Sequence, residues 1–215
     1  MTKPVQEAES FVEASALTYD RHASALGRVS LVWTELHEVM GKMFARLVSR
    51  DDQTLGLAAW NALSNDRAQR SMLLAVAKAT LEKADSRLVE LAWAIGQMDS
   101  LENNRNDALH SPYTMTIFNG SIRIIPNYFQ GQRRAMNLKD RDLETELTSY
   151  QDNIWSIVRY VSAISRALFP TFPRNRLVST QPTTLPPRPL LPKPAHGSTQ
   201  KRSSSLARQR KISPT

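Results

Sequence analysis

The chain contains no cysteine, few glycines and no long uninterrupted run of apolar residues. The absence of cysteine excludes disulfides and thiolate metal sites, and it fits a reducing cytoplasm. No apolar run is long enough to span a membrane, and the acidic amino-terminal stretch has no apolar signal core. We therefore expect a cytoplasmic protein without a transmembrane segment. The sequence also has no glycine-rich phosphate loop and no metal-ligand cluster, so it predicts neither a cofactor nor a metal site.

Acidic residues are missing from the last 45 residues, which carry nine Lys or Arg residues and eight of the twelve prolines. The net charge of +8 belongs to this tail, because the first 170 residues hold 19 basic and 20 acidic side chains. With few large apolar groups, the tail cannot bury enough surface to offset the entropy lost on ordering. The sequence therefore predicts a folded domain over residues 1–170 and a disordered, proline-rich basic tail over residues 171–215.

Apolar residues recur at intervals of three and four along most of the first 170 residues, which is typical of helices packed on a core. The pattern predicts a long helix from Leu26 and a short helix over residues 55–63. A polar cap within residues 64–66 begins the next helix, and a further helix begins at residue 85 or 86. The four tryptophans are expected to fill the core of this domain: Trp33, Trp60, Trp93 and Trp155.

The clearest repeat runs from Leu143 to Leu168, and Pro170 ends it. Its 3.5-residue spacing favours nearly aligned helix packing, as in a bundle. Before it, Asn119-Gly120 joins two β-prone runs, and both residues of this pair accept the positive φ of a tight hairpin turn. The fold class predicted is all-α, a four- to five-helix bundle with a small β-hairpin at about residues 114–126 inserted before the last helix.

The strongest candidate for chemistry is the segment Arg105-Asn106-Asp107-Ala108-Leu109-His110, just before Pro112. Arginine holds phosphate through a rigid fork of donors, and histidine moves protons near neutral pH. The helical phase turns Arg105 toward the packed side, whereas Asn106 and His110 are four apart and share a neighbouring face. Pro112 disfavours helical geometry in the residue before it, so His110 is expected in the last helical turn.

Arg105-Asn106-x-x-x-His110 at a helix end, in a small helical domain, resembles the motif of the HEPN superfamily. That motif is an arginine, usually followed by a polar residue, with four to six residues between the arginine and a histidine. The resemblance implies a bundle that forms homodimers and brings two motifs into one cleft. Active members are metal-independent endoribonucleases, often toxins or defence effectors. Arg105 would then bind the scissile phosphate, Asn106 would orient or bind it, and His110 would act as acid or base on the ribose 2′-hydroxyl.

RNA would be the substrate of such an enzyme, and an antitoxin or another regulatory protein would be a partner. Other domains that resemble this superfamily have lost activity and serve in binding or dimerisation. A non-catalytic helical module that dimerises or docks a partner, with the basic tail as an anchor, therefore remains the alternative.

Four further residues are candidates for substrate binding. Tyr113 follows His110 by three residues, whereas a toxin branch of the HEPN superfamily places a tyrosine at two. Arg133 and Arg134, next to the aromatic pair Tyr128-Phe129, can hold phosphates while bases stack, as in single-strand binders. Arg123 of the predicted hairpin can contribute to the same surface. A structured loop between hairpin and helix is the alternative interpretation of this region.

Two histidines and two tail segments complete the set of candidates. His22 and His37 have no carboxylates at metal-ligand spacing, so we interpret them as histidines at the edge of the core. Residues 186–192 contain Pro-x-x-Pro spacings, which fit either a rigid spacer or a ligand for aromatic grooves. The basic cluster at residues 201–211 would attract RNA, DNA or an anionic membrane in a salt-dependent way.

Overall fold

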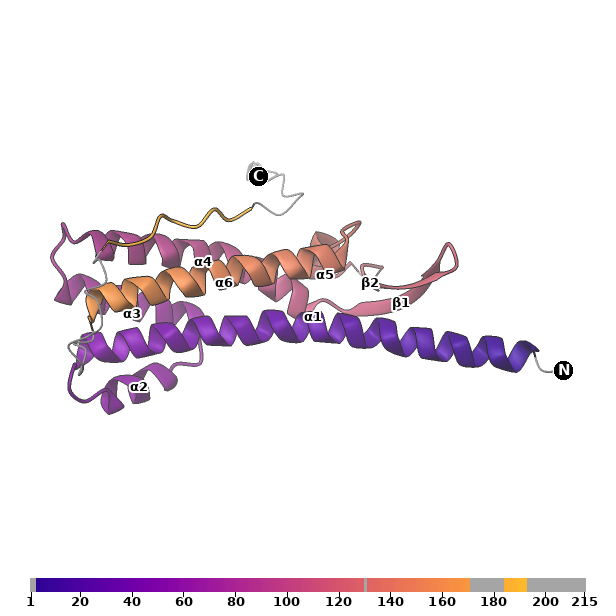
Figure 1. Cartoon of the computed structure of the whole chain (residues 1–215), viewed down its shortest axis with the longest axis horizontal. Coiled ribbons are helices and arrows are strands. Elements are labelled where there is room, and N and C mark those ends of the chain that lie inside the picture. Colours follow the sequence, from indigo (N-terminus) through magenta and orange to yellow (C-terminus); the bar gives the residue numbers. More distant parts are fainter. Residues whose placement is uncertain (1–2, 130, 171–183, 193–215) are drawn as a thin grey trace, which may run out of the picture.

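Helices account for most of the computed structural model, which describes residues 3–129, 131–170 and 184–192. The remaining parts of the predicted tail, including its basic cluster, lie outside the described residues. The elements follow one another along the chain as α1 (Lys3–Val48), α2 (Thr54–Asn61), α3 (Asp66–Thr80), α4 (Ser86–His110), β1 (Tyr113–Phe118), β2 (Ser121–Pro126), α5 (Arg133–Asn137) and α6 (Leu143–Leu168) (Figure 1). The predicted helical bundle with a small hairpin is confirmed. The helix count differs from four or five because residues 133–137 form an additional short helix between the hairpin and α6.

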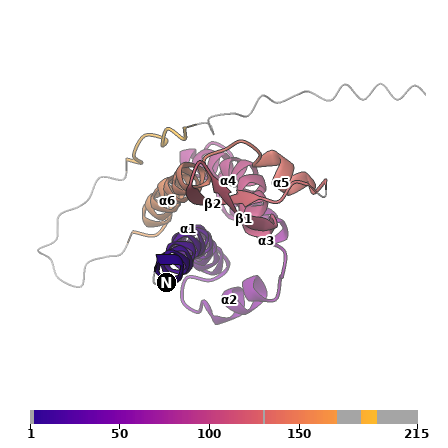
Figure 2. The same ribbon diagram turned by 90° about the vertical axis from the view of Figure 1, so that its right-hand side faces the viewer.

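Three long helices, α1, α4 and α6, run side by side and enclose the core (Figures 1 and 2). The predicted repeat of α6 forms its buried face, where Ile154, Ile157, Val161 and Ile164 are fully shielded from solvent. From α1 the core receives Val29, Leu36, Met40 and Met43, and from α4 it receives Leu91, Ala94 and Met98. Burial of these aliphatic side chains is the main force that holds the three helices together.

Helix α2 packs on the side of α1 that faces away from α6 (Figure 2). The close approach depends on Gly56, because a Cβ atom added there would lie 2.6 Å from Cα of Ala45. Backbone cannot move aside as a flexible side chain can, so this position accepts no larger residue without a shift of α2.

Gly56→Ala is therefore expected to lower the free energy of unfolding by about 1–3 kcal/mol, through overpacking between α1 and α2. Gly27→Ala is the matched control, because Gly27 lies in helix α1 with no atom within 4 Å of an added Cβ. That control should stabilise the protein by about 0.5–1 kcal/mol, since alanine is the better helix former. Urea denaturation of both variants measures the difference, and changes of the same sign would contradict the packing described.

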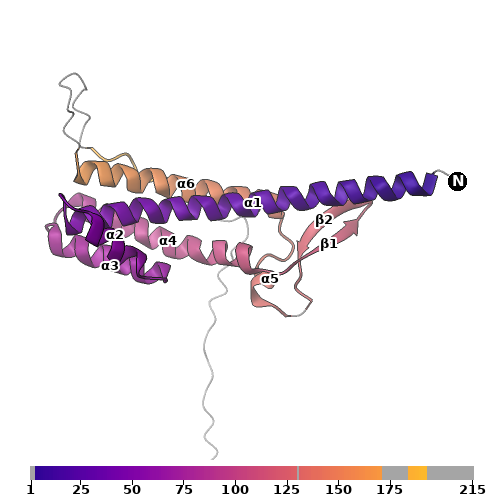
Figure 3. The ribbon, with the colours of Figure 1, turned by 90° about the horizontal axis from the view of Figure 1, so that it is seen from below.

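Helix α1 begins at Lys3 rather than near Leu26, and its first half extends beyond the other helices (Figure 3). The prediction placed the start too late because this half has no continuous apolar stripe. The hairpin lies beside the extension, with β2 in contact with α1. Several large apolar side chains of this region are exposed, among them Phe11, Val12, Tyr19, Ile117 and Phe118.

The hairpin forms as the Asn-Gly pair predicts. Strands β1 and β2 pair antiparallel, with Phe118 opposite Ser121 and Tyr113 opposite Pro126. Asn119 and Gly120 have φ values of 49° and 74°, the two positive angles that a tight turn between right-twisted strands requires. The starts of α3 and α4 were also predicted correctly. Asn65 caps α3, and Asp85 caps α4 by accepting a hydrogen bond from the Arg87 amide at 2.8 Å.

Candidate functional site

The candidate motif lies at the carboxyl end of α4, where side chains from three segments bind the last backbone carbonyls. The carbonyls of residues 106–108 accept hydrogen bonds from Arg134 of α5 at 3.1 Å, from the Ser111 hydroxyl at 2.6 Å and from the Tyr113 hydroxyl at 2.7 Å. Ser111 is extended and Pro112 follows it, so the backbone provides no capping turn. These side chains replace the missing cap and hold the end of α4 in place.

Arg105 is half-buried and points toward α1, as the helical phase predicts. Its guanidinium carbon lies 5.6 Å from the centre of the Trp33 ring, and Nη1 donates a hydrogen bond of 2.8 Å to Oδ1 of Asn106. Nε is buried and has no hydrogen-bond partner in the part of the chain that the structure describes. Within the described residues, no carboxylate lies at salt-bridge distance from this guanidinium, so its charge is not neutralised by an acidic side chain.

The next buried arginine along the bundle, Arg70 of α3, is paired with two carboxylates, although its Nη1 is buried with no hydrogen-bond partner among the described residues. It lies 2.8 Å from Oδ1 of Asp99 and 2.6 Å from Oε2 of Glu102. Glu102 precedes Arg105 by one turn of α4 and would be its natural partner. Because Arg70 binds Glu102, Arg105 is left without an acid.

A polar cluster that the sequence did not predict lies behind Arg105, between α1 and α3. Trp33 donates from Nε1 to Oδ2 of Asp66 at 2.9 Å, and His37 Nε2 lies 3.6 Å from the same oxygen. Gln69 donates from Nε2 to two backbone carbonyls, at 3.0 Å each. Its Oε1 is therefore the acceptor for Nδ1 of His37 at 3.1 Å. The cluster fixes the Trp33 ring, against which the guanidinium of Arg105 packs.

Burial lowers the pKa of His37, and the positive charges of Arg70 and Arg105 lower it further, while Asp66 and the hydrogen bond that His37 donates to Gln69 raise it. Burial also lowers the pKa of His22, which packs edge-on against Tyr113 with ring centres 4.5 Å apart. The interpretation of both residues as core-edge histidines fits their part-buried positions. Both side chains favour the neutral form in the folded protein.

Acidification is therefore expected to destabilise the fold before the carboxylates titrate. A histidine whose folded pKa lies below its unfolded value of 6.5 contributes stability that is complete above that value. This stability is lost as the pH falls below 6.5 toward the folded pKa. Urea unfolding at pH 7.5 and pH 5.5 measures the loss. The loss of stability between the two pH values should be smaller in the double variant His22→Gln/His37→Gln. An equal loss in that variant would show that the two histidines do not cause it.

His110 lies in the last turn of α4, and its exposed side chain makes no hydrogen bond to another described residue. It is five residues from Arg105, which separates the two side chains by about 140° around the helix. Asn106 lies between them, since it accepts the Arg105 hydrogen bond and shares a helix face with His110. The structure thus brings Arg105 and Asn106 together and leaves His110 on the adjoining surface.

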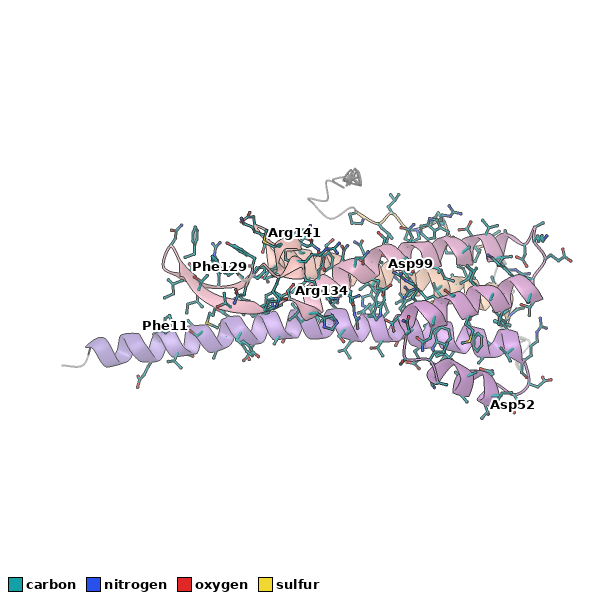
Figure 4. All side chains as sticks on the ribbon, turned by 180° about the vertical axis from the view of Figure 1, so that it is seen from behind. Phe11, Asp52, Asp99, Phe129, Arg134 and Arg141 are labelled. Atoms are coloured by element: carbon teal, nitrogen blue, oxygen red, sulfur yellow. The ribbon has the colours of Figure 1, made fainter. Side chains whose placement is uncertain are left out.

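The four predicted substrate-binding residues lie in different places. Arg133 and Arg134 are exposed on α5, and Arg134 reaches the motif through the carbonyl of Asn106 (Figure 4). Tyr113 is partly buried, and burial raises the pKa of its hydroxyl, which donates to the end of α4. Arg123 is exposed on the hairpin, with its guanidinium 5.3 Å from the Phe118 ring centre. The hairpin extends along α1 away from α5 (Figure 3).

An aromatic and basic surface borders the motif through α5 and the loop before it. Phe129 is 77% exposed and stacks on Tyr128 with ring centres 4.8 Å apart (Figure 4). The ammonium of Lys139 lies 5.1 Å from the Tyr128 ring centre. Helix α5 is tied to α4 by Asn137, which donates to Oδ2 of Asp107 at 2.7 Å. No local pattern could have revealed this contact, since it joins residues 30 apart.

Comparison with protein-family models, curated proteins and solved structures found no match to this chain. Within residues 3–129, 131–170 and 184–192, no group of three or more His, Asp or Glu side chains is placed to hold a metal ion. In the same ranges, no helix is both long and apolar enough to cross a membrane.

Proposed function

We propose that the chain is a metal-independent endoribonuclease that acts as a homodimer, with its site at the carboxyl end of α4. The observation that carries the proposal is the fixed, unneutralised guanidinium of Arg105. Trp33 and Asn106 hold this arginine in place, and it has no carboxylate partner among the described residues. A preorganised guanidinium without an acid is a binding site for an anion, and the phosphate of RNA is the anion that the adjoining aromatic and basic surface fits.

The proposed reaction is transesterification at phosphorus. The ribose 2′-oxygen attacks the phosphate while a histidine takes its proton, the bond from phosphorus to the 5′-oxygen breaks, and the leaving oxygen receives a proton. The products are a 2′,3′-cyclic phosphate and a 5′-hydroxyl. Arg105 stabilises the negative charge that builds up on the phosphate oxygens, and Asn106 positions Arg105.

The reaction needs one group to accept a proton and another to deliver one. Each chain offers one exposed histidine at the motif, His110. A two-fold dimer that brings two copies of α4 together would supply both groups. Exposed apolar side chains on the projecting half of α1 and on the hairpin provide a surface for such association.

Replacement of Arg105 tests the proposal. Arg105→Ala is expected to lower the cleavage rate of a single-stranded RNA by about 10²–10³-fold, the usual effect of removing one donor that stabilises a developing charge. Arg105→Lys keeps the charge but loses the planar fork, so it should recover only part of the rate. Single-turnover kinetics in excess EDTA measure both variants. If Arg105→Ala keeps the helical circular dichroism signal and cleaves RNA at the wild-type rate, the proposal is contradicted.

The second candidate function is a non-catalytic module for dimerisation or partner docking. The observation that favours it is the exposed apolar surface along the first half of α1, with Phe11 at 47% and Val12 at 66% exposed. It predicts tight self-association without RNA cleavage. Analytical ultracentrifugation combined with the cleavage assay separates the two functions, because a stable dimer that leaves RNA whole supports this module.

A further inference from the structure

Residues 184–192, part of the predicted disordered tail, lie along α4 and α6 (Figure 1). Leu185 and Leu191 pack against the core, and Asn153 of α6 donates to the carbonyl of Pro192 at 3.4 Å. Thr184 and Leu185 line the same open cavity as Ala167, so the segment returns to the bundle close to the end of α6. This segment thus contacts the bundle, which the prediction of a tail disordered throughout did not anticipate.

Arg188 is the main polar contact of the segment. Its Nε and Nη2 lie 2.7 and 3.1 Å from the two carboxylate oxygens of Glu90, and its guanidinium carbon lies 5.1 Å from the centre of the Trp93 ring. Tyr160 donates to Glu90 at 2.6 Å and packs edge-on against Trp93. The carboxylate is thus held in place for a bidentate bond to a guanidinium that also stacks on an indole.

Residues 184–192 lie over a groove between α4 and α6, here called the α4/α6 groove. Past Arg188, this groove contains a second aromatic side chain. Trp155 of α6 is 39% exposed, contrary to its predicted place in the core, and it lines an open cavity of about 600 Å³ together with Pro186, Pro187 and Pro189. A second cavity of about 710 Å³ lies between Arg188 and the end of α4 that carries Asp85. The segment therefore covers the groove without filling it.

We propose that the α4/α6 groove is a recognition site for proline-rich, arginine-bearing segments of a partner protein, and that residues 184–192 occupy it in cis as an internal competitor. The chemistry is that of polyproline recognition, in which prolines lie on aromatic side chains and an arginine pairs with a carboxylate. The chain's own Pro-Pro-Arg-Pro sequence defines the ligand. The proposal does not depend on RNA cleavage.

Three observations indicate that this segment, residues 184–192, can be replaced in the groove by a partner segment. Its backbone forms neither helix nor strand, so no backbone ladder holds it. Its outer residues remain in solvent, with Leu190 95% exposed. The salt bridge between Arg188 and Glu90 is partly exposed, with 45% and 21% of the two side chains accessible. Attachment in cis supplies an effective concentration of about a millimolar, which offsets weak contacts and which a better-fitting partner segment can overcome.

The experiment measures binding of a fluorescein-labelled peptide with the sequence of residues 184–192 to the full chain by fluorescence anisotropy. The variant Arg188→Glu should bind this peptide at least about tenfold more tightly than the wild type, because its own segment is repelled by Glu90 and leaves the groove open. Arg28→Glu makes the same charge change at an exposed position of α1 and should bind like the wild type. A peptide with its prolines replaced by alanine should bind weakly.

A charge exchange tests the contact itself. In the full chain, Glu90→Arg should not bind the natural peptide but should bind a peptide that carries Arg188→Glu. The proposal is overturned if Arg188→Glu binds the natural peptide no better than the wild type, since the segment would then act only within its own chain. It is also overturned if Glu90→Arg binds both peptides equally.

Discussion

Replacing His110 with alanine is expected to lower the rate of RNA cleavage by about 10²–10⁴-fold, the range that a positioned general acid or base contributes. The loss should appear in the rate and not in the stability, because the side chain of His110 is exposed and makes no hydrogen bond to another described residue. Single-turnover cleavage in EDTA gives the rate, and urea denaturation should show a change in the free energy of unfolding within about 0.5 kcal/mol.

The matched control for this substitution is Asn103→Ala. Asn103 is exposed on the same helix, two turns before His110, and should leave the rate unchanged. Mixing the His110→Ala variant with wild-type chains tests the homodimer. If two copies share one site, excess variant should lower the activity per wild-type chain. An equal loss of cleavage rate in His110→Ala and Asn103→Ala would show that His110 does not act as an acid or base in the reaction.

Replacing Arg70 with alanine is expected to cost about 2–4 kcal/mol of the free energy of unfolding. Removing one partner of a fully buried pair typically costs about 3–5 kcal/mol, because the other charge is left without solvent or counterion. The expected loss is lower here because the Asp99 side chain is 50% exposed and can be hydrated, whereas only 18% of the Glu102 side chain is accessible. Urea denaturation at pH 7.5 measures the change.

Arg67→Ala is the control for Arg70. Arg67 lies 3.7 Å from the same Glu102 oxygen but is 67% exposed, so its removal should cost less than about 1 kcal/mol. In the double variant Arg70→Ala/Glu102→Gln the uncompensated charge is gone, and the combined loss should be smaller than the sum of the single losses. If Arg70→Ala and Arg67→Ala cost the same, the buried pairing described for Arg70 is wrong.

Arg70 also connects the fold to the proposed site. It pairs with Glu102, the carboxylate one helical turn before Arg105 on α4. Any Arg70→Ala protein that remains folded should therefore bind and cleave RNA less well, because Glu102 loses its closest partner and, with only the exposed Arg67 beside it, can pair with Arg105. Under the proposal, the pairing of Arg70 with Glu102 is what leaves Arg105 available for an anion.

Much of the fold could be predicted because its signals are local. The spacing of apolar residues in α6, the caps Asn65 and Asp85, and the Asn119-Gly120 turn each act within a few residues, and the structure places all of them as expected. The start of α1 was missed, because its first half is helical without a continuous buried face. Helix α1 therefore extends to Lys3.

The candidate site could be predicted only where it is continuous in sequence. The position of Arg105 and His110 at a helix end followed from the helical phase and from Pro112. The contacts that support the site join separate elements: Trp33 from α1, Asp66 from α3, and Arg134 and Asn137 from α5. Trp155 was misplaced because it falls outside the buried face of α6 formed by Ile154 and Ile157, and it lines the open cavity beside the proline-rich segment.

The measurement that tests the central proposal most directly is cleavage of an end-labelled single-stranded RNA by the purified full chain in excess EDTA, with analysis of the new ends. The proposal predicts cleavage that leaves a 2′,3′-cyclic phosphate on the upstream fragment and a 5′-hydroxyl on the downstream one. Intact RNA after incubation with the dimer would contradict it, as would cleavage that appears only after Mg²⁺ is added and leaves 3′-hydroxyl ends.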